Sequence, residues 1–244
     1  ADIFEDINDI KRQFHHLVKL IPNSGNIIYY HDDENTSDVL SKASYSNLIA
    51  INADNINVNL ITKELTVDDE TYSLEDLPLI GEHNLKNYVC AILAAQIDGI
   101  EISDSIDSLK SFLGVKRRME KIAEIDGIKI YDDFAHHPTA IRLSSSALRN
   151  KHPHEKILGV IELGSNTMSS GYHDEDLLNS FESINEALIL DAKVKYEGDN
   201  IFQSIDVLND ELIKRIKDYD IILIMTNRDS QKFIKPILES FEEK

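Results

Sequence analysis

The second half of the chain alternates short apolar runs with amphipathic stretches, and this alternation is the feature that most restricts its fold. The apolar runs at 128–131, 156–161, 187–190 and 221–225 have the length of buried strands. Helical patterns at about 139–150, 174–183, 207–217 and 230–241 follow them. Apolar strands that alternate with helices are typical of a parallel sheet covered on both faces. The pattern predicts a doubly wound α/β domain.

A different pattern precedes Gly114. Apolar spacing there predicts helices over 2–21, 36–42, 84–98 and 103–112, strands at 26–30 and 48–51, and antiparallel hairpins within 55–74. Asn35 or Thr36 is the expected cap of the second helix. Bases become more frequent after Gly114. We therefore predict two domains, 1–113 and 114–244.

Net charge and cysteine content exclude several classes of protein. The chain has 44 acidic and 25 basic residues, a formal charge of −19, which disfavours duplex nucleic acid and anionic membranes as partners. No apolar run approaches the ~20 residues that span a bilayer, and no signal peptide opens the sequence. A single cysteine, Cys90, excludes an intrachain disulfide framework. A cytoplasmic protein that acts on small molecules is expected.

The segment Gly81–Asn87 (Gly-Glu-His-Asn-Leu-Lys-Asn) joins a glycine turn to a helix start. Its amides Asn84 and Asn87 offer both donors and acceptors, which suit the edge of a nucleobase. The alternative is that Asn84 only caps the helix.

Charged and imidazole side chains concentrate at the start of the second domain. Lys116-Arg117-Arg118 is the one run of three bases, and it either holds phosphates or forms a solvated face. Tyr131–Pro138 (Tyr-Asp-Asp-Phe-Ala-His-His-Pro) follows a strand, where ligands bind in open α/β folds. Asp132 and Asp133 suit ribose hydroxyls or Mg²⁺, and His136 and His137 suit a carboxylate or phosphoryl group. The alternative is a helix-capping aspartate with surface histidines.

The loop Glu162–Met168 follows the next strand and is expected to line the same cleft. The chain has no Gly-x-x-x-x-Gly-Lys-Ser/Thr phosphate loop and no Gly-x-Gly-x-x-Gly motif.

Four segments in this order resemble the Mur ligase family. They are 1–4 with 12–18, Gly81–Asn87, Gly114–Glu120 and Tyr131–Thr139. The Phe-Ala-His-His-Pro version of the last segment and Ser165–Met168 are similar to the branch that uses a murein tripeptide. The resemblance covers essentially the whole chain. It implies an α/β fold in which 1–113 form the C-terminal part of a truncated central ATPase domain that lacks its phosphate loop, and 114–244 form a Rossmann-like, doubly wound carboxy-terminal domain.

The resemblance also implies a reaction. Such an enzyme uses ATP to join UDP-N-acetylmuramate to L-alanyl-γ-D-glutamyl-meso-diaminopimelate through an acyl phosphate. ATP and Mg²⁺ are the implied cofactors, with the metal ligands expected upstream of Ala1 and none in this chain. The chain itself is then expected to be a fragment that lacks turnover and binds ATP weakly or not at all.

Residue roles follow from the same resemblance. Arg118, which would reach the ATP phosphates, and His136 are the implied catalytic residues. The implied nucleotide-binding set has Asp133 at the ribose and consists of His83, Asn84, Asn87, Arg118, Asp132 and Asp133. The implied substrate-binding set is Arg117, His136, His137, Ser165, Asn166 and Thr167.

Three departures from the family pattern leave the substrate open. Leu163-Gly164 stand where the family has Pro-Arg, Ser169 replaces a lysine, and Arg228-Asp229-Ser230 replace a glycine-rich stretch after Asn227. Two alternatives therefore stand beside the tripeptide ligase. One is the related ligase that adds free L-alanine to UDP-N-acetylmuramate, and the other is a diverged, non-catalytic binding module.

Overall fold

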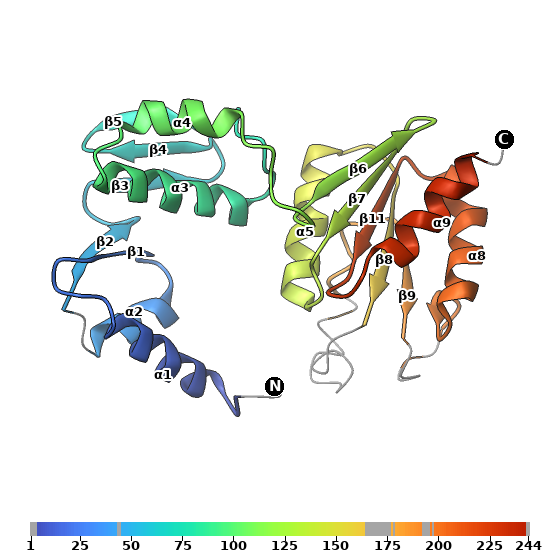
Figure 1. Ribbon diagram of the computed structural model, residues 1–244, viewed down its shortest axis with the longest axis horizontal. Helices are drawn as coiled ribbons and strands as arrows, with labels where there is room; N and C mark the ends of the chain where they lie inside the picture. Colours follow the sequence, from blue (N-terminus) through green and yellow to red (C-terminus); the bar gives the residue numbers. More distant parts are fainter. Residues whose placement is uncertain are drawn as a thin grey trace. The chain divides into compact units, whose positions relative to one another are not determined.

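The computed structural model describes residues 4–42, 45–163, 177, 179–191, 196 and 198–242. It separates into two compact units, unit 1 over Ala1–Leu113 and unit 2 over Gly114–Lys244. Each unit has its own sheets and its own hydrophobic core (Figure 1).

Unit 1 opens with two helices that pack around a pair of parallel strands. The elements are α1 (Ile7–Val18), β1 (Asn26–Tyr30), α2 (Glu34–Ser41) and β2 (Asn47–Ile51). Asp6 caps α1 by accepting from the N–H groups of the second and third helical residues, so the helix is shorter than the predicted 2–21. The cap of α2 is Asp33, and the prediction of Asn35 or Thr36 was wrong.

The rest of unit 1 is a three-stranded antiparallel sheet covered by two helices. The strands are β3 (Ile56–Asn59), β4 (Glu64–Val67) and β5 (Glu70–Ser73), which confirm the predicted hairpins. The helices are α3 (Glu82–Ile97) and α4 (Ile102–Lys110). Buried aliphatic side chains from strands and helices form one cluster, which includes Ile51, Leu65, Leu74, Val89, Ile92 and Ile106.

Unit 2 contains a six-stranded sheet in the order β10-β9-β8-β11-β7-β6. Its strands are β6 (Glu120–Ile125), β7 (Ile128–Asp133), β8 (Ile157–Glu162), β9 (Glu186–Leu190), β10 (Ile201–Phe202) and β11 (Ile221–Met225). All neighbours pair in parallel except β6, which is antiparallel to β7. Since the chain runs from β7 to β8 and later returns to place β11 between them, the predicted doubly wound domain is confirmed.

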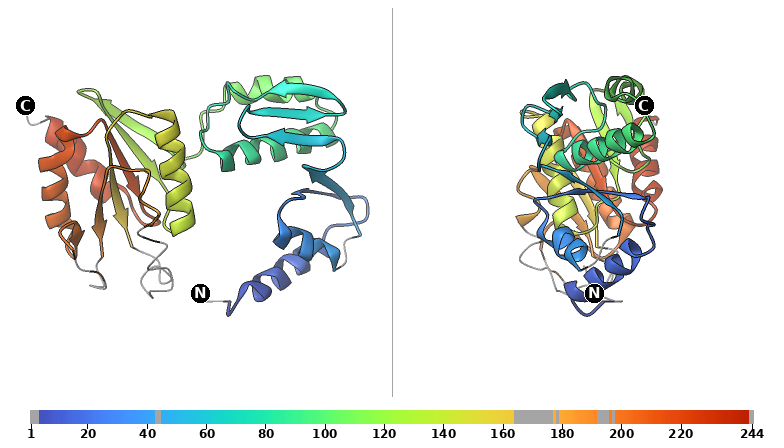
Figure 2. Two further views of the ribbon diagram at one scale, coloured as in Figure 1. Left: turned by 180° about the vertical axis from the view of Figure 1, so that it is seen from behind. Right: turned by 90° about the vertical axis from the view of Figure 1, so that its left-hand side faces the viewer.

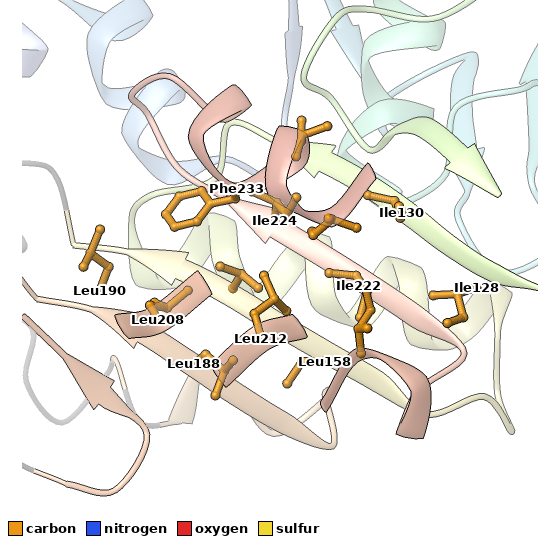
Figure 3. Close-up of a cluster of buried hydrophobic side chains, with 14 residues drawn as sticks. Ile128, Ile130, Leu158, Leu188, Leu190, Leu208, Leu212, Ile222, Ile224 and Phe233 are labelled. Atoms are coloured by element: carbon orange, nitrogen blue, oxygen red, sulfur yellow. The ribbon is translucent and has the colours of Figure 1, made fainter. Parts of the chain in front are cut away.

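Helices cover both faces of this sheet. The helix α5 (Pro138–Lys151) lies on one face, and α8 (Ile205–Arg215) and α9 (Gln231–Glu242) lie on the other (Figures 1 and 2). A short 3-10 helix, η1 (Ile216–Asp218), follows α8. The side chains under α8 and α9 include Leu158, Leu188, Leu208, Leu212, Ile222, Ile224 and Phe233, all fully buried (Figure 3).

Three parts of unit 2 differ from the sequence-based expectations or lie beyond what is described. The strands β6 and β10 were not predicted, because β6 mixes charged with apolar residues and β10 has only two residues. The helix predicted at 174–183 falls largely outside the described residues, and residues 180–183 form a turn.

At the start of β9, Glu186 ties this strand to the segment that precedes β11. Its carboxylate accepts hydrogen bonds from the Tyr219 hydroxyl, from Asn200 Nδ2 at 2.9 Å and from Arg215 Nη1 at 2.5 Å. The Tyr219 hydroxyl contributes most to lowering the pKa of Glu186 below its ordinary value of 4.5. A lowered folded-state pKa stabilises the fold above the unfolded value, and this contribution is lost as the pH falls.

We expect Glu186→Gln to lower the free energy of unfolding at pH 7 by about 1–2 kcal/mol, because the hydrogen bonds lose their charge-assisted character. The deficit relative to the wild type should shrink as the pH falls below 4.5, where Glu186 of the unfolded wild-type chain begins to bind a proton while the folded carboxylate is still ionised. Urea unfolding at pH 7 and pH 4 measures both effects. Glu239→Gln is the matched control, since this side chain is 57% exposed and pairs with Lys235 across one helical turn. A deficit that does not depend on pH would contradict the assignment.

Candidate functional site

The carboxyl ends of β7, β11 and β8 form one edge of the sheet in unit 2. The last residues of these strands are Asp133, Met225 and Glu162, and Met225 pairs with Asp133 on one side and with Ile161 on the other. Ligands of open parallel sheets bind beyond this edge, at the point where the connections reverse direction. The candidate site is therefore built from the residues that follow these three strands.

Asp133 is buried, and its carboxylate is used by the chain itself. Oδ2 accepts from Met119 N at 2.8 Å, while Oδ1 accepts from Ala135 N at 2.8 Å and from Ser144 Oγ at 3.1 Å. Burial raises the pKa of this carboxyl above its ordinary value, although the two backbone N–H groups oppose the shift. Asp133 thus fastens the segment before β6, the loop after β7 and the middle of α5 to the end of β7.

Asp132 is also buried, on the face of the sheet that carries α9. Its Oδ2 accepts from Ser230 Oγ at 2.6 Å and lies 3.4 Å from Arg117 Nε. Its Oδ1 is buried and has no hydrogen-bond partner among the described residues. A buried carboxylate oxygen without a donor is costly, so this atom has an unused capacity to accept a hydrogen bond.

Arg117 and Arg118 both lie against the ring of Phe134. Their guanidinium carbons are 5.1 and 5.4 Å from the ring centroid, within the range of a cation–π contact. Arg117 and Met119 have φ angles of 58° and 53°, which are uncommon for residues other than glycine. This tight turn presents the two guanidinium groups at the candidate site, where Arg118 is exposed and Arg117 is half-buried.

The two histidines of the Tyr131–Pro138 segment are half-exposed. His136 Nδ1 lies 2.7 Å from the carbonyl oxygen of Phe134, and its ring meets the Phe134 ring at 78°. His137 is the N-cap residue of α5 without a side-chain capping bond, and Pro138 begins the helix. Neither Asp132 nor Asp133 caps α5, so the helix-capping alternative is wrong.

A third buried carboxylate at this edge, Glu162, was not assigned a role from the sequence. Glu162 Oε2 accepts from Thr226 Oγ1 at 2.5 Å, and Oε1 lies 2.5 Å from Lys232 Nζ and 3.8 Å from Arg228 Nη1. Thr226 follows β11, and Lys232 belongs to the first turn of α9. A charged residue at the end of a wholly apolar strand is the one local signal that could have identified Glu162.

In unit 1, the two amide side chains of the Gly81–Asn87 segment differ in their exposure to solvent. Gly81 is the N-cap of α3 with φ 98°, a conformation that glycine adopts readily. Asn84 is buried and donates from Nδ2 to the carbonyl oxygen of Ile80 at 2.8 Å, so the proposal that it caps the helix was wrong. Asn87 is exposed and His83 is half-exposed.

Some predicted features have no structural test. Ser165, Asn166 and Thr167 lie outside the described residues. Within the described part of the chain, no group of three or more His, Cys, Asp or Glu residues is placed to hold a metal ion. None of the helices in that part is both long enough and apolar enough to span a bilayer.

Two family models match the chain. The model described as Mur ligase middle domain matches residues 1–95, and the model described as Mur ligase, glutamate ligase domain, matches residues 117–228.

Curated proteins and a solved structure agree with these matches. The UDP-N-acetylmuramate--L-alanyl-gamma-D-glutamyl-meso-2,6-diaminoheptandioate ligase of Escherichia coli (strain K12) is 33% identical over 93% of this chain and 54% of that protein. The UDP-N-acetylmuramate--L-alanine ligase of Clostridium botulinum (strain Kyoto / Type A2) is 29% identical over 88% of this chain and 48% of that protein. The chain therefore spans about half the length of these relatives. The crystal structure of a murein peptide ligase from Psychrobacter arcticus 273-4 is similar with a TM-score of 0.71 at 26% identity, over 99% of this chain and 56% of that one.

We expect Asp133→Asn to lower the free energy of unfolding of unit 2 by about 1–3 kcal/mol. The amide keeps one acceptor oxygen but turns an NH₂ group toward donors, so at least one buried N–H group loses its partner. Urea unfolding measures the loss. The control is Asp229→Asn, because the exposed Asp229 accepts from Gln231 N at 2.9 Å, a bond that an asparagine oxygen also accepts. Equal stability of the two variants would show that Asp133 is not an anchor.

Proposed function

Because the chain belongs to the Mur ligase family, we propose that the protein containing it is an ATP-dependent amide ligase of peptidoglycan recycling. Its substrates in this proposal are UDP-N-acetylmuramate and the tripeptide L-alanyl-γ-D-glutamyl-meso-diaminopimelate. Residues 1–113 belong to the central ATPase domain and 114–244 form the carboxy-terminal domain. The similarity to the Escherichia coli ligase, 33% identity over 93% of this chain, supports this choice of substrates.

The observation that carries the proposal is the cluster beyond β7. A cationic group on an aromatic ring, Arg118 on Phe134, lies at the same sheet edge as Asp132, whose buried Oδ1 has no partner among the described residues. Guanidinium groups suit phosphate oxygens, and an unpaired carboxylate oxygen suits a hydroxyl donor. This combination matches the charged and the sugar parts of a nucleotide.

Within this proposal Asp132 and Asp133 have different roles. Asp132 accepts from a ribose hydroxyl of ATP, in place of Asp133, to which the family resemblance gave that role. Asp133 keeps the loop with Arg117 and Arg118 in place, since its own oxygens already accept three hydrogen bonds. His83, Asn84 and Asn87 serve the adenine side, where the exposed amide of Asn87 is the one best able to contact a base. Mg²⁺ is the second cofactor, and we assign no ligand for it within this chain.

The remaining residues are assigned to the acceptor peptide. Arg117, His136 and His137 lie beside the nucleotide residues, and Ser165, Asn166 and Thr167 belong to the loop after β8. In the proposed reaction the muramyl carboxylate takes the γ-phosphoryl group of ATP and ADP leaves. The peptide amine then forms the amide bond, loses a proton and displaces phosphate. A closed site that excludes water would protect the acyl phosphate from hydrolysis.

The related L-alanine ligase activity remains the second candidate, because the Clostridium botulinum relative of that name is 29% identical over 88% of this chain.

The deciding experiment is a substrate comparison with the full-length protein that contains this chain. We expect ADP release with UDP-N-acetylmuramate and the tripeptide to exceed that with free L-alanine by at least about 100-fold in kcat/KM, a difference that unpaired polar groups in a site can produce. Preference for L-alanine would support the second candidate. Absence of ligation with either acceptor, together with intact folding, would support a non-catalytic binding module.

Arg118 and Phe134 give a sharper test of the nucleotide assignment. We expect Arg118→Gln to lower kcat by about 100-fold or more, the usual cost of losing a charge that stabilises a transition state. Phe134→Leu should lower kcat by a smaller factor through the position of Arg118, and Phe134→Tyr should restore it because the ring returns. If Phe134→Leu lowers kcat equally in the Arg118→Gln background, the ring does not act through Arg118.

A further inference from the structure

The group of side chains around Glu162 is not used by the proposed nucleotide site. It consists of Glu162 at the end of β8, Thr226 after β11, and Arg228 and Lys232 from the start of α9 and the loop before it. The strands β8 and β11 are hydrogen-bonded neighbours, so the group forms one continuous part of the carboxyl edge (Figure 1).

Glu162 acts as a fixed anion inside this group. It is 4% exposed, and both of its oxygens are engaged, Oε2 by Thr226 Oγ1 and Oε1 by Lys232 Nζ, each at 2.5 Å. A buried carboxylate requires such a paired and hydrogen-bonded environment. Glu162 and Lys232 together therefore form a rigid, neutral support at the end of β8.

Arg228 is attached to this support but faces solvent. Its Nη1 lies 3.8 Å from Glu162 Oε1, its side chain is 55% exposed, and its backbone N–H donates to Thr226 Oγ1 at 3.0 Å. An ion pair at that distance and exposure is weak in itself. The neighbouring acid, Asp229, turns Oδ1 to the N–H group of Gln231 at 2.9 Å. The guanidinium is thus placed by the support and keeps the planar donor geometry that binds carboxylates.

Arg228 brings a cation to the end of β8. Its Nη1 lies 3.8 Å from Glu162 Oε1, and the residue that follows Glu162 in the chain, Leu163, is apolar.

We propose that Arg228 is a specificity-determining residue that binds one carboxylate of the acceptor peptide, supported by Glu162, Thr226 and Lys232. This inference rests on the proposed function, and it adds the residue that selects a polyanionic acceptor. Free L-alanine has one carboxylate beside its amine, whereas the tripeptide has additional carboxylates farther along. A cation at the end of β8 discriminates in favour of the longer acceptor.

The test uses the full-length protein with ATP, UDP-N-acetylmuramate and the tripeptide. Arg228→Gln is expected to raise KM for the tripeptide by about 10–100-fold, the usual worth of a charge-assisted hydrogen bond to a ligand, and to change KM for ATP less than twofold. Lys235→Gln is the matched control in α9, the helix that follows Arg228, because its side chain is 74% exposed and pairs with Glu239 at 3.6 Å. The control should leave both KM values unchanged.

Tripeptides amidated at a single carboxylate identify the contact. With the wild type, one amidated tripeptide should show a KM raised by the same factor that Arg228→Gln causes for the unmodified tripeptide. With the Arg228→Gln variant, that amidation should raise KM no further. An unchanged KM for the tripeptide in Arg228→Gln, or independent losses for every amidated peptide, would overturn the inference while the ligase function stands. If the wild type does not ligate the tripeptide at all, the proposed function fails and this inference fails with it.

Discussion

The position of β11 is the constraint on which the candidate site depends. All five of its residues are buried, and it pairs with β7 on one edge and β8 on the other. A strand enclosed by neighbours and helices meets no water, which is why Ile-Ile-Leu-Ile-Met can occupy it and a polar sequence cannot. Its insertion places Thr226 between the ends of β7 and β8. Asp133 and Glu162, which are separated by a helix in the sequence, thereby become parts of one edge.

The three buried carboxylates at this edge are stabilised in different ways, and their functions follow from the difference. Asp133 is held by neutral donors and holds a loop, while Glu162 is held by Lys232 and holds the cations after β11. Asp132 alone retains an oxygen without a donor among the described residues. Because a buried charge is tolerated only when it is paired or hydrogen-bonded, most of the acid groups here serve to position cations. The site therefore presents arginines to a ligand although its buried side chains are mainly acidic.

Local patterns allowed the strands and the Asp132-Asp133 segment to be predicted, because each is a contiguous run with its own period or chemistry. The same approach missed β6, whose sequence Glu-Lys-Ile-Ala-Glu-Ile has no regular alternation, since its antiparallel pairing with β7 defines it more than its composition does. It also missed the partners of the buried acids. Lys232 reaches Glu162 across 70 residues, and Ser230 reaches Asp132 across 98. No local spacing encodes such contacts, which arise only when β11 enters the sheet.

The net charge of −19 and the proposed site for anionic ligands are compatible because the two electrostatic effects act over different distances. Exposed charges are screened beyond about 8 Å at physiological ionic strength, so exposed acids farther than this from the sheet edge contribute little there. The pairs Arg117–Asp132 and Lys232–Glu162 have one partner buried in the apolar sheet, where screening is weaker and geometry is fixed. What a ligand meets is set by the few guanidinium groups that these pairs place at the surface. The charge that matters for binding in this chain is therefore local, and the overall sign of the protein does not predict it.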